Sequence, residues 1–257
     1  MTICIAAICN ENTTIVAAFD HMLSSSWISA DSIGGFKFIP LGGTWGAMVA
    51  ADDVTEAEPI TEKVKQRMTQ ERRSIAQMES LFKDAYVSER QSRAESQILG
   101  VYGLTMDRFV SKGYKEMGGR VFYELCTQIQ KVRLSCQFLI VGFDDKYKPQ
   151  LSVIDDTGIA SRFTKIGFAA IGCGAPNALG NLYLHEYQKR FSPDLAVYLV
   201  SEAKFMAESA PGVGKKTTII KMNSTPDGDV SYHGRVTSCT DQKGMGREGQ
   251  AQTPEGY

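Results

Sequence analysis

Apolar residues follow one another without a break over Ile3–Cys9, and a second apolar run covers Ile15–Phe19. The polar segment Asn10-Glu11-Asn12 lies between them and has the composition of a tight turn. Two strand-like runs around a short polar turn predict a β-hairpin over Thr2–Cys9 and Thr13–Asp20. A chain terminus is usually frayed, whereas this one has the composition of a strand in a protein core.

Further along the chain the pattern alternates between a strand period and a helix period. Strands are predicted at Phe36–Leu41 and Trp45–Ala51, followed by helices at Ala57–Met68, Ser74–Arg93, Met106–Gly113 and Gly119–Lys131. Strands return at Gln137–Phe143, Gln150–Asp155 and Arg162–Ile171, before helices at Asn177–Lys189 and Ser192–Ser209 and a strand at Thr217–Met222. Separate blocks of strands and helices predict a layered α+β domain in which helices pack outside two sheets. We expect one domain over residues 2–222, with an extended helical region at about 54–137 and a polar, partly disordered tail at 223–257.

The composition, with 43% hydrophobic and 22% charged residues, is ordinary for a globular protein. A net charge of −1 gives no basic field for nucleic acid or an anionic membrane, so neither is expected as a partner. No apolar run approaches the roughly 18 residues of a membrane span. A signal peptide has basic residues before its apolar run, and here no Lys or Arg precedes the first run, so none is expected. Six scattered cysteines and three dispersed histidines favour reduced thiols, a cytoplasmic location, and no metal or cofactor.

Two glycine-rich segments resemble nucleotide-binding motifs, but each departs from the pattern. In Gly212-Val213-Gly214-Lys215-Lys216-Thr217, Ser209 takes the place of the first P-loop glycine, and the predicted helix and strand lie in reverse order. In Gly172-Cys173-Gly174 a strand does lead into a helix, but Asn177 replaces the third glycine of a dinucleotide-binding turn. A tight strand-to-helix turn that needs small residues is favoured there.

Thr2 has the chemistry of a nucleophile once Met1 is removed, because one residue then carries both a hydroxyl and a free α-amine. An α-amine titrates at about 7.7–8.0 in model compounds, which suits a general base near neutral pH. Threonine activated by its own N-terminal amine is an accepted nucleophile, provided that a cation and a backbone N–H donor assist it.

Lys37 and Asp20 are candidates for that assistance. Lys37 lies among the apolar residues of Phe36–Leu41, and Asp20 ends the second hairpin strand, where an unpaired carboxylate is costly. An Asp20–Lys37 pair would place the ammonium beside Thr2. Alternatively, each side chain lies at a strand edge and points to solvent.

Several short motifs follow Thr2 in an order that resembles the proteasome β-type fold, which belongs to the N-terminal nucleophile (Ntn) hydrolases. They are AAFD (17–20), FKFIP (36–40), GAMVAAD (46–52), FLIVGFD (138–144), FAAIGCGAPNALG (168–180) and ESAPG (208–212). The resemblance covers nearly all of residues 2–222 and is nearest to bacterial proteasome-related proteins, in which Thr follows the initiator Met. It implies a four-layer αββα sandwich of two antiparallel sheets flanked by helices.

The same resemblance implies roles for individual residues. Thr2 becomes the nucleophile with its own amine as the base, Lys37 the electrostatic activator, and Asp20 the partner of Lys37. Ala51 takes the place of the glycine whose N–H stabilises the oxyanion, so that a methyl group crowds this donor.

Other positions depart from the family pattern. Cys173 stands where the family has a serine, Glu208 where it has an aspartate, and Pro211 where a second serine follows that aspartate. These departures affect the groups that position Thr2. The helical region is longer than the family's helix pair, which makes Tyr102–Lys115 a candidate arm at a subunit contact or pore.

The leading hypothesis is a threonine-type amide or peptide hydrolase that acts through an acyl-enzyme on Thr2. It implies a peptide or protein substrate, a self-compartmentalising homo-oligomer such as a ring, and an unfoldase as a candidate partner. The alternatives are an inactive proteasome-like scaffold subunit, which Ala51, Cys173 and Pro211 favour, a non-proteolytic Ntn amidase, and a nucleotide-binding protein.

Overall fold

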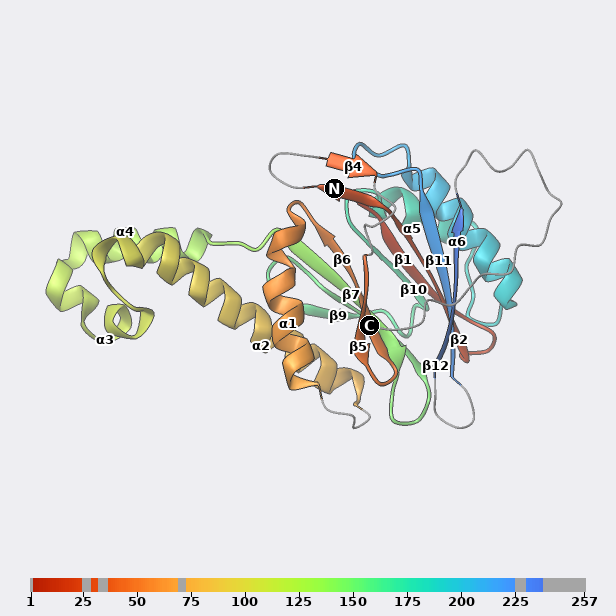
Figure 1. Cartoon of the computed structure of the whole chain (residues 1–257), viewed down its shortest axis with the longest axis horizontal. Coiled ribbons are helices and arrows are strands. Elements are labelled where there is room, and N and C mark those ends of the chain that lie inside the picture. The colour runs from red at the N-terminus through yellow and green to blue at the C-terminus, as the bar shows by residue number, and fades with distance from the viewer. Residues whose placement is uncertain (1, 25–28, 32–36, 69–72, 225–229, 238–257) are drawn as a thin grey trace, which may run out of the picture.

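Two five-stranded antiparallel sheets form the centre of the molecule (Figure 1). The computed structural model describes residues 2–24, 29–31, 37–68, 73–224 and 230–237. The first sheet has the order β10-β1-β2-β11-β12 and consists of β1 (Cys4–Cys9), β2 (Thr14–Asp20), β10 (Phe168–Ile171), β11 (Thr217–Ser224) and β12 (Val230–Thr237). The second has the order β5-β6-β7-β8-β9 and consists of β5 (Phe38–Gly42), β6 (Trp45–Ala51), β7 (Cys136–Phe143), β8 (Pro149–Ile154) and β9 (Ala160–Arg162). A separate two-stranded ribbon is formed by β3 (Met22–Ser24) and β4 (Ser29–Asp31).

Helices cover the outer face of each sheet. These helices are α1 (Glu58–Arg67), α2 (Ile75–Ala94), α5 (Ala175–Leu184) and α6 (Pro193–Ala207), and the short 3-10 helix η1 (Val54–Glu56) precedes α1. One apolar cluster fills the space between the sheets, with Phe19 on one side and Leu139 on the other. A second cluster lies between the second sheet and α1 and α2, and a third between the first sheet and α5 and α6. The four-layer αββα sandwich that the resemblance implied is therefore confirmed.

The predicted N-terminal hairpin is present, and β1 is an inner strand of its sheet. It pairs with β2 along one edge and with β10 along the other. All residues of β1 and β2 are buried, which explains why the sequence shows continuous apolar runs instead of alternation. Asn10, Glu11 and Asn12 all have positive φ in the connecting turn, a conformation in which Asn is several-fold enriched. Thr2 consequently lies at the end of a strand that is held from both sides.

Two predicted elements differ from the structure because turns interrupt them. The predicted strand Arg162–Ile171 is split into β9 and β10, and Gly167, with φ of +95°, lies in the turn that separates them. The predicted helix Asn177–Lys189 ends at Leu184, and Glu186 has φ of 47° shortly after it. A positive φ is incompatible with continuing either element.

The tail expected from residue 223 onwards is partly strand. β11 extends to Ser224 and pairs with β12 along its whole length, from Thr217↔Thr237 to Ser224↔Val230. β12 is the last strand of its sheet, and edge strands commonly carry polar residues, so their pattern resembles that of a loop. Residues 225–229 and 238–257 lie outside the described part of the chain.

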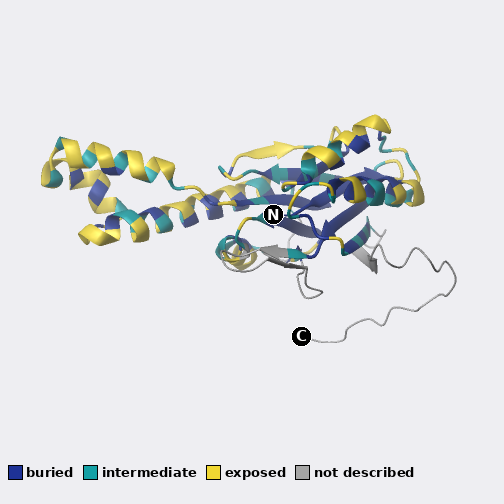
Figure 2. Ribbon diagram, turned by 90° about the horizontal axis from the view of Figure 1, so that it is seen from above, coloured by how far each residue is buried: buried dark blue, intermediate teal, exposed yellow. Residues whose placement is uncertain are grey.

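Part of the extended helical region, residues 95–131, forms an arm that projects from the sandwich (Figures 1 and 2). Its elements are the π-helix η2 (Glu95–Leu99), the 3-10 helix η3 (Gly100–Tyr102), α3 (Met106–Met117) and α4 (Gly119–Lys131), which continue from the end of α2. The arm has a small apolar core of its own, made of Leu99, Leu104, Phe109 and Leu125. None of the helices that the structure describes has both the length and the apolar character needed to cross a membrane.

Candidate active site

Thr2, Asp20 and Lys37 are in direct contact at the end of β1. Lys37 Nζ donates hydrogen bonds to Thr2 Oγ1 and Asp20 Oδ1, and the Thr2 hydroxyl donates to Asp20 Oδ1. The three residues are 1%, 0% and 4% exposed, respectively. The alternative in which Lys37 and Asp20 point to solvent is therefore wrong, while the catalytic role of the cluster stays a prediction.

The two sheets bring these residues together. Thr2 and Asp20 lie at the same end of the β1–β2 hairpin, where Asp20 N donates to Ile3 O over 3.2 Å and Ile3 N donates to Asp20 Oδ1 over 3.2 Å. Lys37 directly precedes β5 in the other sheet, and its carbonyl accepts a hydrogen bond from Val49 N over 3.1 Å. The cluster thus bridges the interior between the sheets, where a charged residue is tolerated only when it is paired.

Asp20 also holds a loop that follows α6. Gly214 N donates to Asp20 Oδ2 over 2.6 Å, so each carboxylate oxygen has its own set of donors. One oxygen serves Thr2, Ile3 and Lys37, and the other serves Gly214. This bond fixes the plane of the carboxylate and hence the direction in which it faces Lys37.

Cys173 lies against the backbone of Thr2. Thr2 N, which is a peptide nitrogen here because Met1 precedes it, donates to Cys173 Sγ over 3.3 Å. The thiol in turn lies 3.4 Å from Thr2 O and 3.3 Å from Pro211 O, both of which accept from it. The thiol at this position therefore contacts the atom that would become the amine of the nucleophile.

Gly172 allows the chain to pass close to Thr2. A Cβ atom on this residue would lie 2.3 Å from Thr2 O, and its φ of +95° is also unfavourable for other residues. Gly174 N donates to Thr2 O over 3.3 Å. The glycines that superficially resembled a dinucleotide motif therefore serve to hold the first strand.

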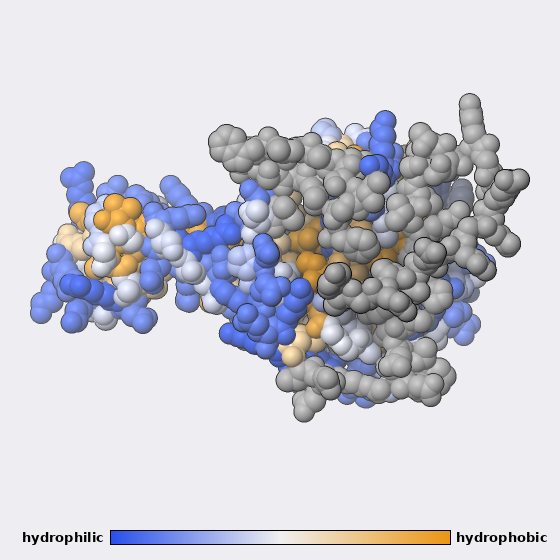
Figure 3. All heavy atoms as spheres, viewed as in Figure 1, coloured by the Kyte–Doolittle hydropathy of each residue, from blue (hydrophilic) through white to orange (hydrophobic). Residues whose placement is uncertain are grey.

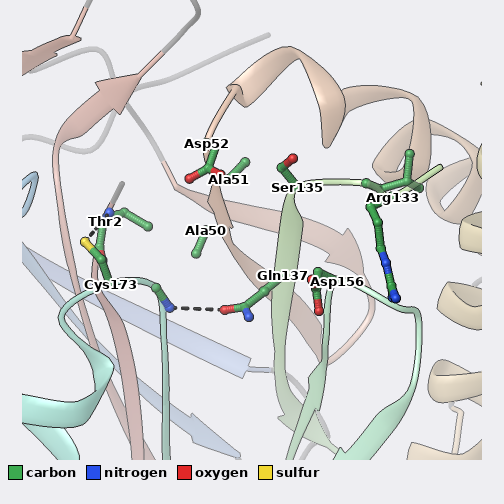
Figure 4. Close-up of a pocket in the computed structure, with 11 residues that line it drawn as sticks. Thr2, Ala50, Ala51, Asp52, Arg133, Ser135, Gln137, Asp156 and Cys173 are labelled. Atoms are coloured by element: carbon green, nitrogen blue, oxygen red, sulfur yellow. Dashed lines mark hydrogen bonds between the residues drawn. The ribbon is translucent and has the colours of Figure 1, made fainter. Parts of the chain in front are cut away.

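A cleft of about 290 Å³ opens beside Thr2 (Figure 4). Its lining residues are Thr2, Ala50, Ala51, Asp52, Arg133, Leu134, Ser135, Gln137, Asp156, Gly172 and Cys173. In Figure 4, Thr2 and Cys173 lie at one end and Arg133 lies toward the other, with Ala51 across from Thr2. Gln137 Oε1 accepts a hydrogen bond from Gly172 N over 3.3 Å and so links the walls that the two sheets contribute. Ala51 and Cys173 are thus placed at the cleft.

Glu208 does not contact Thr2; it forms an ion pair with Lys204 on α6. Lys204 Nζ also donates to Gly214 O over 2.8 Å and to Lys215 O over 3.2 Å. Glu208 therefore reaches the cluster only through Lys204 and the loop that contains Gly214. Sequence reasoning missed Lys204 and Gly214. For Lys204 the available signal was its place between two apolar residues, Ala203 and Phe205.

Three buried cysteines, Cys4, Cys9 and Cys136, differ from Cys173 in exposure. Burial raises the pKa of the Cys4 thiol to about 12, although the nearby Lys37 acts in the opposite direction. Burial likewise raises the pKa of Cys9 and Cys136 to about 11. Cys173 is exposed, and the described cysteines are all free. Within the described ranges, no three His, Cys, Asp or Glu residues are grouped so that they could hold a metal ion.

The four-layer αββα sandwich is the fold that the resemblance to the Ntn hydrolases implied, and it buries a threonine, a lysine and an aspartate together at the end of an inner strand. The model of the proteasome subunit family matches residues 102–212, which extend from the arm to the loop after α6. The predicted resemblance to proteasome subunits is therefore confirmed over that segment, which includes Cys173 and Glu208 but not Thr2, Asp20 or Lys37. No curated protein matches the chain in sequence.

Proposed function

We propose that this chain is a threonine-type hydrolase that cleaves amide or peptide bonds through an acyl-enzyme on Thr2. The observation that carries the proposal is the contact of Lys37 Nζ with both Thr2 Oγ1 and Asp20 Oδ1, in a buried cluster beside the cleft. A lysine held between a hydroxyl and a carboxylate places positive charge where an alkoxide has to form. The match to the proteasome subunit family supports peptide hydrolysis as the class of reaction.

The reaction requires a free amine on Thr2, so whatever precedes Thr2 must first be removed. The neutral amine takes the proton from Thr2 Oγ1, and Oγ1 bonds to the carbonyl carbon of the substrate. The amine then returns this proton to the leaving nitrogen as the C–N bond breaks, which leaves an ester on Oγ1. Water that is deprotonated by the same amine hydrolyses the ester and restores the hydroxyl.

Two groups stabilise the charges that develop during these steps. The ammonium of Lys37 stabilises negative charge on Oγ1, and Asp20 holds the ammonium in place. The backbone N–H of Ala51 is the proposed donor to the oxyanion of the tetrahedral intermediate, because Ala51 lines the cleft across from Thr2. Removal of a single donor of this kind typically costs about 10²–10³ in rate.

Peptides or unfolded protein segments are the proposed substrates, because small residues at Ala50, Ala51 and Gly172 leave room beside Thr2 for an extended backbone.

We further infer a homo-oligomer such as a ring, with an unfoldase as a candidate partner, on the strength of the family match. The free thiols of the described cysteines support a cytoplasmic location.

The experiment compares the unmodified protein with Thr2→Ala, which removes Oγ1 and keeps the backbone. Both proteins are incubated with fluorogenic peptides and with a β-lactone probe, and intact mass spectrometry follows the probe and the presence of Met1. We expect the unmodified protein to lack Met1, to hydrolyse peptide and to gain one probe per chain. Thr2→Ala should neither hydrolyse peptide nor bind the probe. Thr127→Ala, an exposed threonine on the arm, serves as the matched control and should behave like the unmodified protein.

Two results would contradict the proposal. Retention of Met1 on the purified protein would leave Thr2 without its amine, and absence of the probe would favour an inactive scaffold subunit. Labelling without peptide hydrolysis would instead identify a non-proteolytic amidase on the same nucleophile.

A further inference from the structure

Lys204 is a lysine whose ammonium is enclosed by the protein. The residue is 2% exposed, although it lies on α6 in the outer helical layer. Its Nζ has three acceptors, which are Glu208 Oε1, Gly214 O and Lys215 O. An ammonium has three donors, so all of its hydrogen-bonding capacity is used.

The acceptors of Lys204 lie in the loop that contacts Asp20. Gly214 is held at both of its backbone polar groups, because its carbonyl accepts from Lys204 and its N–H donates to Asp20 Oδ2. The side chain of Val213 packs into the apolar cluster beneath α5 and α6 and anchors the loop next to this point. A continuous path of contacts therefore runs from Glu208 through Lys204 and Gly214 to Asp20 and Lys37.

The loop has no helix or strand of its own to fix its position. It lies between the end of α6 at Ala207 and the start of β11 at Thr217, and Gly212 adopts a φ of +84° within it. Backbone in such a segment takes its position from the contacts that it makes. The bonds from Lys204 to two successive carbonyls hold the backbone directly after the Gly214 N–H, and together with the packing of Val213 they set its direction.

We propose that Lys204, held by Glu208, is a positioning residue for the active site: it fixes the Gly214 loop so that Gly214 N–H orients Asp20, and Asp20 in turn orients Lys37 toward Thr2. The inference rests on the proposed function of Thr2 for its kinetic consequence, but its structural consequence at Gly214 is independent of that function. Lys204 does not line the cleft, so it acts on the rate of the chemical step and not on the binding of substrate.

The experiment uses Lys204→Met in the full chain, which retains the aliphatic stem and removes the donors. We expect kcat, and the rate constant of β-lactone labelling, to fall by at least about tenfold, because misplacement of a catalytic group by 1 Å is enough for losses of this size. KM should stay within about twofold of its original value, and the final extent of labelling should remain one probe per chain. Amide hydrogen exchange at Gly214 should become faster as its bond to Asp20 is lost.

Matched variants separate positioning from simple loss of stability. Lys189→Met is the control, because Lys189 Nζ also donates to a backbone carbonyl, that of Thr164, but on a loop away from Thr2. It should leave kcat and the exchange of Gly214 unchanged. The double variant Lys204→Met, Glu208→Leu replaces the largely buried ion pair by apolar groups, which commonly preserves folding, and it should show the same loss of kcat as Lys204→Met.

The outcomes are distinct. An unlabelled wild-type protein would contradict the proposed function of Thr2, while exchange at Gly214 would still decide the role of Lys204. Unchanged exchange at Gly214 in Lys204→Met, or a full rate of labelling in that variant, would overturn the positioning role. A lower final extent of labelling with an unchanged rate constant would also overturn it, because that result indicates a smaller folded fraction and nothing more.

Discussion

At the scale of single residues, some groups of the site can be predicted from the sequence and others cannot. Thr2, Asp20 and Lys37 were predicted because a hydroxyl, a carboxylate and an ammonium are conspicuous among apolar neighbours. The donation from Gly214 N to Asp20 could not be predicted, because a backbone N–H is present in every residue except proline and leaves no signature. Lys204 was missed because a lysine on an outer helix is ordinarily exposed.

Thiol reactivity gives a prediction at this scale. With iodoacetamide at pH 8, we expect Cys173, which is exposed, to be alkylated before Cys4 and Cys136, which are buried and should stay unmodified. Burial raises the pKa of Cys4 to about 12 and that of Cys136 to about 11, so their reactive thiolate forms are scarce at pH 8. Peptide mass spectrometry measures the order of modification. Early modification of Cys4 would mean that β1 opens readily, and denatured protein, in which these cysteines all react, is the control.

At the scale of elements, uninterrupted segments were predicted well and interrupted ones were not. β6 and α4 have the predicted bounds, Trp45–Ala51 and Gly119–Lys131: β6 is a continuous apolar run that ends before Asp52, and α4 begins directly after Gly118. The division between β9 and β10 was missed, because residues 163–167, which end in Gly167 at a positive φ, form a turn within a segment that reads as a single strand. Periodicity reports burial along an element, and it does not report where the backbone turns.

Gly172→Ala tests the element that follows β10. The added Cβ would meet the backbone oxygen of Thr2 at 2.3 Å, and the φ of +95° is strained for alanine, so we expect a loss of more than about 2 kcal/mol in the free energy of unfolding. Urea denaturation measures the loss. Gly180→Ala on α5 is the control: nothing lies within 4 Å of its added Cβ, so it should stabilise the protein by about 0.5–1 kcal/mol. Equal effects of the two substitutions would contradict the close packing of Gly172 on Thr2.

The contact between α1 and α2 carries a pH-dependent contribution through Glu89. Burial opposes ionisation of Glu89, but hydrogen bonds from Lys63 and Arg93 outweigh it, so its pKa lies below the ordinary value. Because the pKa is lowered on folding, ionised Glu89 stabilises the folded state at pH values above its ordinary pKa. This stabilisation is lost as the pH falls through the lowered pKa of the folded state. We expect Glu89→Gln to cost about 1–3 kcal/mol at pH 7, with a smaller difference from the unmodified protein in acid. Urea titrations at several pH values measure this difference, and a cost independent of pH would contradict the ionic origin.

At the scale of the whole molecule, the arm is the part that departs most from the compact sandwich. Its apolar core is small, and it exposes further apolar side chains, among them Val101 at 80% and Val110 at 74%. Figure 3 shows apolar side chains gathered at the far end of the arm. Because few buried contacts hold the arm, its local stability is expected to be lower than that of the sheets.

Phe109→Ala tests whether the arm opens independently. Phe109 stacks on Phe122 with ring centroids 4.8 Å apart, and it is 3% exposed. We expect its truncation to speed amide hydrogen exchange throughout residues 95–131 and to leave exchange in β1 and β7 unchanged, as mass spectrometry of peptic peptides would measure. Faster exchange in the sheets as well would show that the arm and the sandwich unfold as one unit.

The place of β1 inside its sheet also constrains how the protein is made. The ribosome produces β1 before the other strands of its sheet, and one of its two edges has no partner until β10 has been synthesised. Once both neighbours are paired, Thr2 is 1% exposed, and an external aminopeptidase can no longer draw the preceding residue into its own cleft. On the proposed mechanism, the residue before Thr2 therefore has to be removed before the sheet is complete. Two preparations of the same sequence, from hosts with different peptidase levels or growth temperatures, will then differ in the fraction of molecules that carry a usable amine.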